Sequence, residues 1–183
     1  MRMVQLSHEE IVQICQEAGN TLDKTVSDIV HLLDKRSKKI ATAESCTGGM
    51  LSQLITSVSG ASSIFELGLC TYSDAMKERF LHVPKGLLDT YGAVSAQVAG
   101  SMARGLSELS GAELCISVTG FAGPGGGTEK YPVGTVFVAV KYKDHMCVAH
   151  LELYRFCEMQ RSAIRKAAAV CVFGIALKML KEC

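Results

Sequence analysis

The sequence lacks an excess of charge of either sign. Its 19 lysines and arginines are nearly matched by 18 aspartates and glutamates, which leaves a formal net charge of +1. The basic residues are spread along the chain, so the sequence has no dense positive patch of the kind that attracts nucleic-acid phosphates. We therefore expect no nucleic-acid partner.

Long hydrophobic runs are also missing. The longest, AAAVCVFGIAL near the C-terminus, is too short to span a bilayer, and the first twenty residues contain no signal-peptide core. We therefore expect a cytoplasmic protein with no membrane partner. The eight cysteines are scattered and form no CxxC pair. This argues against a disulfide framework, and we interpret most of them as small buried hydrophobic residues.

What is present indicates one globular domain. Hydrophobic residues make up 48% of the 183 residues and charged residues 20%, without internal repeats or low-complexity linkers. Between residues 9 and 33, apolar residues recur at helical spacing, interrupted at Gly19-Asn20. The spacing predicts one long or two short amphipathic helices, and we expect residues 1–36 to form a helical segment packed on the rest of the domain.

Strands and helices alternate along the remaining chain. Strands are expected at 38–44, 62–73, 112–120, 133–142 and 145–156, and helices at 47–58, 74–81, 95–109 and 160–181. The last two strands are joined by the short link Lys143-Asp144, which predicts an antiparallel hairpin. Together the pattern predicts an α/β fold, a three-layer α/β/α sandwich with a mixed, mostly parallel sheet. In such sheets ligands bind at the carboxyl ends of the strands.

The stretch TAESCTGGM places three reactive side chains where the first of these strands turns into a helix. Ser45 and Thr47 lie where the helix would offer unpaired N–H groups, which suit an anion or a developing oxyanion. The simpler interpretation is that Thr47 caps the helix and that Gly48-Gly49 allows close packing. Cys46 is a further candidate nucleophile, ranked below Ser45 because no histidine lies near it in the sequence.

A second candidate stretch, TYSDAMK, follows the next expected strand. Tyr72 lies at the strand end and Lys77 in the first turns of a short helix. A desolvated lysine has a lowered pKa and can accept the proton of a serine hydroxyl, so Ser45 and Lys77 would form an acyl-transfer pair without histidine. The alternative is a solvated surface lysine beside a tyrosine at a strand end.

The third stretch is a glycine-rich loop at residues 117–135, SVTGFAGPGGGTEKYPVGT. Its uncrowded backbone N–H groups can form a nest for phosphate or carboxylate, although the loop is neither a P-loop nor a GxGxxG fingerprint. A flexible loop without function is the alternative. Arg161 and Arg165 open the last helix on one face, placed either to bind a phosphate or to pair with a surface acid.

Five motifs carry a resemblance to a known family when they are taken in order and at these separations. They are TAESCTGG, TYSDAMK, YGAVS, TGFAGPGGG and PVGTV. Together they resemble the C-terminal domain of the competence/damage-inducible protein CinA, the nicotinamide mononucleotide deamidase family, from about Asp34 to the C-terminus. The resemblance implies an amidohydrolase that converts nicotinamide mononucleotide to nicotinate mononucleotide and ammonia. It further implies no metal or other cofactor, a small-molecule nucleotide as partner, and a homo-oligomer, dimer or trimer.

The resemblance also implies roles for individual residues. Ser45 would be the nucleophile, Lys77 its base, Tyr72 a support for the proton transfer, and Thr119 a group that positions the amide or relays a proton. The helix N-terminus after Ser45 would hold the oxyanion. The residues implied to bind substrate are Thr47, Gly48, Gly49, Gly120, Ala122, Gly123, Gly125, Gly126 and Arg161.

The sequence departs from the family pattern at a few positions. Asp74 stands where the family usually has asparagine, and its carboxylate would raise the pKa of Lys77. MQR, residues 159–161, replaces the family's GDR. Tyr131 stands just before the proline, where the family often has a lysine or a similar residue. The chain also lacks the N-terminal domain of full-length relatives, as expected for a stand-alone deamidase. The alternative hypotheses are a non-catalytic nucleotide-binding module and a regulatory module of competence or damage response.

Overall fold

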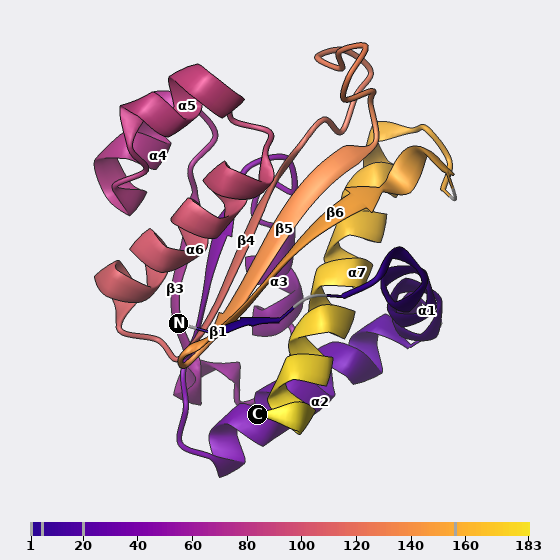
Figure 1. Cartoon of the computed structure of the whole chain (residues 1–183). Helices are drawn as coiled ribbons and strands as arrows, with labels where there is room; N and C mark the ends of the chain where they lie inside the picture. The colour runs from indigo at the N-terminus through magenta and orange to yellow at the C-terminus, as the bar shows by residue number, and fades with distance from the viewer. Residues whose placement is uncertain (1, 5, 20, 156) are drawn as a thin grey trace.

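A six-stranded sheet forms the middle layer of the molecule (Figure 1). The computed structural model describes residues 2–4, 6–19, 21–155 and 157–183. The strands are β1 (Arg2–Val4), β2 (Ile40–Glu44), β3 (Phe65–Cys70), β4 (Leu114–Gly120), β5 (Thr135–Tyr142) and β6 (His145–Glu152). Their order across the sheet is β1-β6-β5-β4-β2-β3. Among these strands β5 alone runs opposite to the others, because it is antiparallel to both β4 and β6.

Helices cover both faces of the sheet, which confirms the predicted three-layer sandwich with a mixed, mostly parallel sheet (Figure 1). One face carries α1 (His8–Gly19), α2 (Leu22–Lys35), α3 (Met50–Thr56) and α7 (Arg161–Glu182). The other carries α4 (Asp74–Leu81), α5 (Lys85–Tyr91) and α6 (Ala96–Ser110). Two short 3₁₀ helices lie at Ala61–Ser63 and Leu153–Arg155. No helix within the described residues has both the length and the apolarity needed to cross a bilayer.

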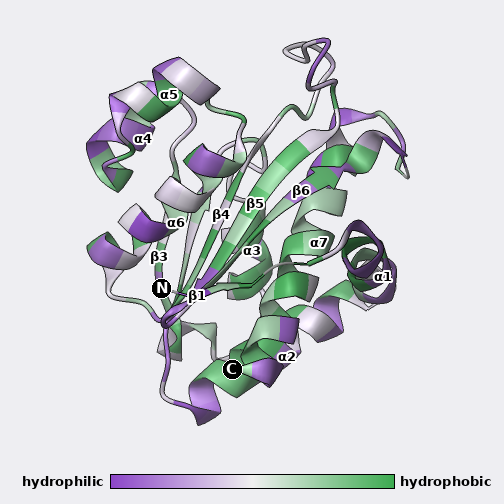
Figure 2. Cartoon of the chain, in the orientation of Figure 1, coloured by the Kyte–Doolittle hydropathy of each residue, from purple (hydrophilic) through white to green (hydrophobic). Residues whose placement is uncertain are grey.

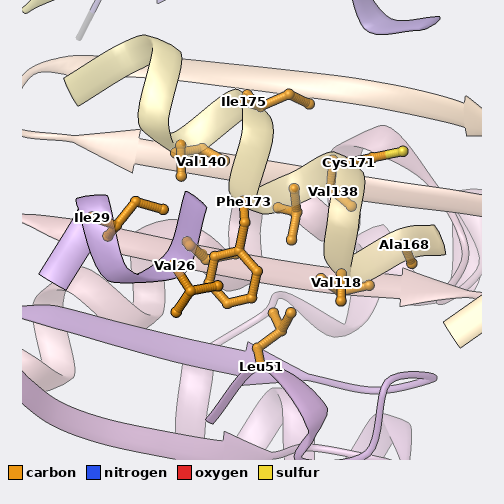
Figure 3. Close-up of a cluster of buried hydrophobic side chains, with 14 of the residues drawn as sticks. Val26, Ile29, Leu51, Val118, Val138, Val140, Ala168, Cys171, Phe173 and Ile175 are labelled. Atoms are coloured by element: carbon orange, nitrogen blue, oxygen red, sulfur yellow. The ribbon is translucent and has the colours of Figure 1, made fainter. Parts of the chain in front are cut away.

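The larger hydrophobic core lies between the sheet and α7. In Figure 3, the Phe173 ring of α7 lies in one buried cluster with Val26 of α2, Leu51 of α3 and Val118 of β4. Figure 2 shows that α7 is mostly apolar along its length, whereas α1 and α2 carry hydrophilic residues on their outer sides. Smaller clusters beneath α6 fill the opposite face. This packing holds the carboxyl ends of β2, β3 and β4 side by side.

Several elements differ from the sequence prediction. The short edge strand β1, which pairs in parallel with β6, and the helix α5 carried too weak a pattern to be predicted. Helix α3 begins at Met50, later than predicted, because Gly48 and Gly49 have φ of +59° and +92° and turn the chain before the helix starts. The predicted helix break at Gly19-Asn20 and strand end at Phe156 include Asn20 and Phe156, which are outside the described residues.

The cysteines follow the prediction only in part. Cys46, Cys115 and Cys147 are buried thiols, as the composition suggested. Cys15 and Cys171, however, form a disulfide that links α1 to α7. The sequence separation of 156 residues between them gave no local signal of this pairing.

Candidate functional site

The three stretches singled out in the sequence meet at one cavity of about 240 Å³. Ser45 directly follows β2, Lys77 lies in α4 after β3, and Thr119 lies near the end of β4. The predicted site residues that line the cavity are Ser45, Tyr72, Lys77, Thr119, Gly120, Ala122, Gly123, Gly125 and Arg161. They converge because β2, β3 and β4 are parallel and end at the same edge of the sheet.

Four predicted substrate-binding residues do not line this cavity: Thr47, Gly48, Gly49 and Gly126. The Gly49 N–H donates to the carboxylate of Glu44, so it faces the protein interior. A Cβ at Gly48 would meet the Arg165 guanidinium at 3.4 Å, an ordinary contact distance, so glycine is favoured there by its φ of +59° and not by close packing. Direct substrate contact by these four residues therefore stays a prediction.

Lys77 is almost completely buried, with 1% of its surface exposed. Its ammonium nitrogen lies 3.5 Å from Asp74 Oδ1 and donates a hydrogen bond of 3.4 Å to the Tyr72 carbonyl. Burial lowers the pKa of Lys77, and the Asp74 carboxylate opposes this shift. The interpretation of Lys77 as a solvated surface lysine is therefore wrong, and a desolvated amine faces the cavity.

Ser45 and Cys46 lie at the end of β2, beside the cavity. The Ser45 N–H donates to the Val118 carbonyl at 3.0 Å, which extends the contact of β2 with β4 by one residue. Burial raises the pKa of the Cys46 thiol to about 12, even though Arg161 and Arg165 act in the opposite direction. The thiol therefore stays protonated near neutral pH, which favours Ser45 as the nucleophile at this corner.

The start of α3 is capped by a residue that sequence reasoning missed. Thr47 was predicted to cap this helix, but the N-cap is Gly49 and makes no side-chain cap bond. Glu44, which has no exposed surface, instead accepts hydrogen bonds from the N–H groups of Gly49, Leu51 and Ser52. An ionisable residue inside an otherwise apolar strand was the signal that pointed to this role.

Thr47 contributes its backbone to the same corner. Its carbonyl accepts two hydrogen bonds from Arg165 of α7, at 3.2 and 2.6 Å. Its buried hydroxyl has no hydrogen-bond partner among the described residues. Of the backbone N–H groups from 46 to 52, those of Cys46 and Thr47 have no hydrogen-bond partner within the described chain. These two N–H groups follow Ser45 in the chain and are therefore candidates for donating to an oxyanion.

Thr119, Tyr72 and Arg161 each make a contact that limits what they can do. The Thr119 hydroxyl donates to the Ala93 carbonyl at 2.9 Å, so its oxygen can only accept from a ligand. Arg161 donates to the Gly123 carbonyl at 2.7 Å and to the Tyr72 hydroxyl at 3.1 Å. The arginine thereby ties α7 to the glycine-rich loop and to the end of β3.

The glycine-rich loop forms the outer wall of the cavity and projects at the top of Figure 1. Gly123 has a φ of +80°, and a Cβ at Gly120 would come within 2.8 Å of the Thr135 carbonyl. These glycines let the loop backbone turn and approach β5 closely. The remaining cavity residues are Cys46, Asp74, Ala93, Val94 and Phe121. Ala93 and Val94 belong to YGAVS and Phe121 to TGFAGPGGG, so the motifs held the signal for them.

Comparison with known sequences gives a consistent match. The family model described as the CinA C-terminal domain matches residues 22–183. A CinA-like protein from Geobacter sulfurreducens is 45% identical over 157 residues, which cover 86% of this chain and 36% of the relative. One from Thermotoga maritima is 39% identical over 178 residues, covering 94% and 42%. The chain therefore spans less than half the length of these curated relatives.

Solved structures of similar fold match this chain over nearly the whole of their own length. A CinA superfamily protein from Klebsiella pneumoniae superimposes with a TM-score of 0.82 at 27% identity, covering 88% of this chain and 98% of that one. A competence/damage inducible protein from Agrobacterium tumefaciens gives a TM-score of 0.79 at 34% identity, covering 87% and 93%. The mixed sheet with helices on both faces is thus an arrangement already observed in this superfamily.

Proposed function

The chain belongs to the family of CinA C-terminal domains, and from this premise we propose that it is an amidohydrolase that converts nicotinamide mononucleotide and water to nicotinate mononucleotide and ammonia. The reaction is the one that the resemblance implies. The observation that carries the proposal is that Ser45 and the buried Lys77 line the same cavity. A serine hydroxyl needs a base to become a nucleophile, and a desolvated lysine amine can supply it.

In the first half of the reaction, Ser45 Oγ attacks the carboxamide carbon while its proton passes to Lys77 Nζ. Lys77 must be neutral at that moment, and its burial favours the neutral amine because it lowers the pKa. The N–H groups of Cys46 and Thr47 would stabilise the oxyanion. The C–N bond then breaks, and Lys77 returns the proton to the leaving nitrogen. Ammonia departs, which leaves the acyl group bound as an ester to Ser45.

In the second half, a water molecule attacks this ester. Lys77 accepts a proton from the water and returns it to Ser45 Oγ as the C–O bond to the serine breaks. Nicotinate mononucleotide is then released. Thr119 can accept a hydrogen bond from the substrate amide but has no proton free for the product carboxylate, since its own proton is held by Ala93. This asymmetry favours binding of the amide over the acid.

The nucleotide part of the substrate would lie toward the glycine-rich loop. Arg161 lines the cavity there and its guanidinium is held in place by the Gly123 carbonyl and the Tyr72 hydroxyl. A guanidinium positioned in this way suits a phosphate group. We also propose that the protein is a homo-oligomer, dimer or trimer, which light scattering of the purified chain would test.

One observation favours a second candidate function, a nucleotide-binding module without turnover. Burial lowers the pKa of Lys77, but the Asp74 carboxylate, 3.5 Å from its Nζ, opposes this shift and favours the charged form that cannot act as a base. Such a module would show a rise in melting temperature with nicotinamide mononucleotide and no ammonia release.

The test is release of ammonia and nicotinate mononucleotide by the purified protein. Ser45→Ala should abolish turnover and Ser62→Ala, an exposed serine, should not change it. Lys77→Met should likewise abolish turnover, with the exposed Lys85→Met as its control. Cys46→Ala should reduce the rate far less than Ser45→Ala. Loss of activity in Cys46→Ala with retention in Ser45→Ala would instead identify the thiol as the nucleophile.

A further inference from the structure

Glu44 is an ionisable residue with no exposed surface, and it directly precedes Ser45. Its two carboxylate oxygens accept four hydrogen bonds of 3.0 Å. One oxygen accepts from the N–H groups of Gly49 and Leu51, the other from the N–H and hydroxyl of Ser52. All four partners are donors, so both oxygens must act as acceptors. Burial of the carboxylate is therefore compensated inside the protein.

The hydrogen-bond network continues into β2. Thr42, which is also fully buried, lies 2.8 Å from the Ser52 hydroxyl, oxygen to oxygen. Because Ser52 gives its own proton to Glu44, Thr42 must be the donor in this second bond. The chain Thr42 to Ser52 to Glu44 thus joins β2 to the first turn of α3 with a fixed direction of hydrogen bonding.

The corner between β2 and α3 is consequently held on three sides. Glu44 holds the N–H groups that begin the helix, Arg165 holds the Thr47 carbonyl, and the Ser45 N–H is bound to β4 through Val118. Between these fixed points stand the Ser45 hydroxyl and the N–H groups of Cys46 and Thr47.

We propose that Glu44 is a positioning residue for the nucleophile: through its four hydrogen bonds it sets the direction of the Ser45 hydroxyl and of the two N–H groups beside it. The inference rests on the proposed amidase function, in which these groups attack the amide and bind its oxyanion. Glu44 does not touch the substrate, since it is absent from the cavity lining. Its effect is on the alignment of Ser45, and misalignment of about 1 Å is known to reduce rates by about a hundredfold.

The contrasting interpretation is that Glu44 serves the stability of the fold alone. The substitution Glu44→Gln separates the two, because it keeps the volume of the side chain but turns an NH₂ group toward two of the four donors, whichever oxygen it replaces. A residue with only a structural role would lower the melting temperature and leave the rate per folded molecule unchanged. A positioning residue would lower kcat in molecules that are fully folded, with little change in KM.

The experiment measures two properties of the purified wild type and of Glu44→Gln. The first is kcat and KM for nicotinamide mononucleotide, with circular dichroism at the assay temperature to confirm folding. The second is the rate at which a small fluorophosphonate labels Ser45, followed by mass spectrometry. We expect kcat and the labelling rate to fall by about tenfold or more, with KM nearly unchanged. Glu66→Gln, an exposed residue of β3, is the matched control.

Ser52→Ala serves as a second variant in case Glu44→Gln does not fold, because it leaves the carboxylate in place and removes one of its four donors. We expect a smaller fall in the same two rates. Labelling of Ser45 at the wild-type rate in a folded Glu44→Gln or Ser52→Ala would overturn the proposal. So would a wild type whose Ser45 is not labelled at all, because there would be no activated serine to position.

The labelling rate also separates this proposal from the proposed function. If wild-type Ser45 reacts with the fluorophosphonate and the Glu44 and Ser52 variants react more slowly, the positioning role stands. Ammonia release by the same protein is assayed separately, and an absence of ammonia would refute the deamidase activity without affecting the role of Glu44.

Discussion

Asp74 precedes Lys77 by one turn of α4, and its Oδ1 lies 3.5 Å from Lys77 Nζ. The two side chains differ sharply in their exposure to solvent. The Asp74 side chain is 56% exposed whereas that of Lys77 is 1% exposed. Burial lowers the pKa of the lysine, and the aspartate raises it. The balance between them sets the fraction of Lys77 that is neutral and able to act as a base.

The first prediction concerns Asp74→Asn. Removing the carboxylate removes an attraction that stabilises the ammonium form, so the pKa of Lys77 should fall further. Activity rises with pH as the base loses its proton, so the acid limb of the kcat/KM profile should move to lower pH. At pH values on the acid side of the wild-type limb, kcat/KM of the variant should therefore exceed that of the wild type. Asp89→Asn, which removes the carboxylate of the exposed Lys85–Asp89 ion pair, is the control. An unchanged acid limb would contradict the assignment of Lys77 as the base.

The second prediction concerns Tyr72→Phe, which removes the hydroxyl that accepts from Arg161. The contact of Tyr72 with Lys77 is through its backbone carbonyl, which the substitution keeps. We expect KM to rise by about fivefold, as for the loss of a hydrogen bond of roughly 1 kcal/mol, with kcat nearly constant. Steady-state kinetics measure both. A large fall in kcat would support the role in proton transfer that the resemblance implied.

The third prediction concerns Thr119→Val, which keeps the shape of the side chain and removes its hydroxyl. The Ala93 carbonyl loses its donor and the substrate amide its acceptor, so kcat/KM should fall by about tenfold or more. Inhibition by nicotinate mononucleotide should strengthen relative to substrate binding, because the acceptor that disfavours a carboxylate is gone. Thr90→Val, on the exposed side of α5, is the control. Equal loss of amide and acid binding would show that Thr119 does not discriminate between them.

The fold was predictable where the pattern was long and regular. The continuously apolar stretch at 112–120 became β4, and the Ser95 hydroxyl caps α6 by accepting from the Val98 N–H, as the Ser-led start of that helix indicated. β1 has three residues and α5 seven, lengths at which apolar periodicity carries little signal. The Cys15–Cys171 disulfide depends on the packing of α1 on α7, which no local pattern encodes.

In the site, the sequence indicated which residues meet but not how their hydrogen bonds are shared. Ser45 and Lys77 follow two parallel strands and Thr119 lies near the end of a third, so their convergence follows from topology. The identity of the residue that caps α3 did not follow, because Ser and Thr are the usual caps and Thr47 stood at a suitable position. Glu44 takes that role through a side chain that points back from the preceding strand, a contact decided by the tertiary structure.

The last prediction tests the packing that supports α4 and therefore Lys77. Gly105 lies in the middle of α6, where a Cβ would collide with the carbonyl of Leu81, the last residue of α4. Alanine normally stabilises a helix interior relative to glycine by about 0.5–1 kcal/mol, but overpacking at such a site costs about 1–3 kcal/mol. Gly105→Ala should therefore lower the free energy of unfolding, measured by chemical denaturation.

Gly86→Ala provides the matched control in α5. A Cβ there meets nothing within 4 Å, so alanine should raise the free energy of unfolding by about 0.5–1 kcal/mol. The two substitutions are chemically identical, but their expected effects on the free energy of unfolding have opposite signs. The difference comes from the Leu81 carbonyl, which lies next to Gly105 and has no counterpart at Gly86. Because Gly105→Ala shifts the end of α4 against α6, it should also lower kcat in the molecules that remain folded. A stabilising effect of Gly105→Ala would contradict the close contact between the two helices.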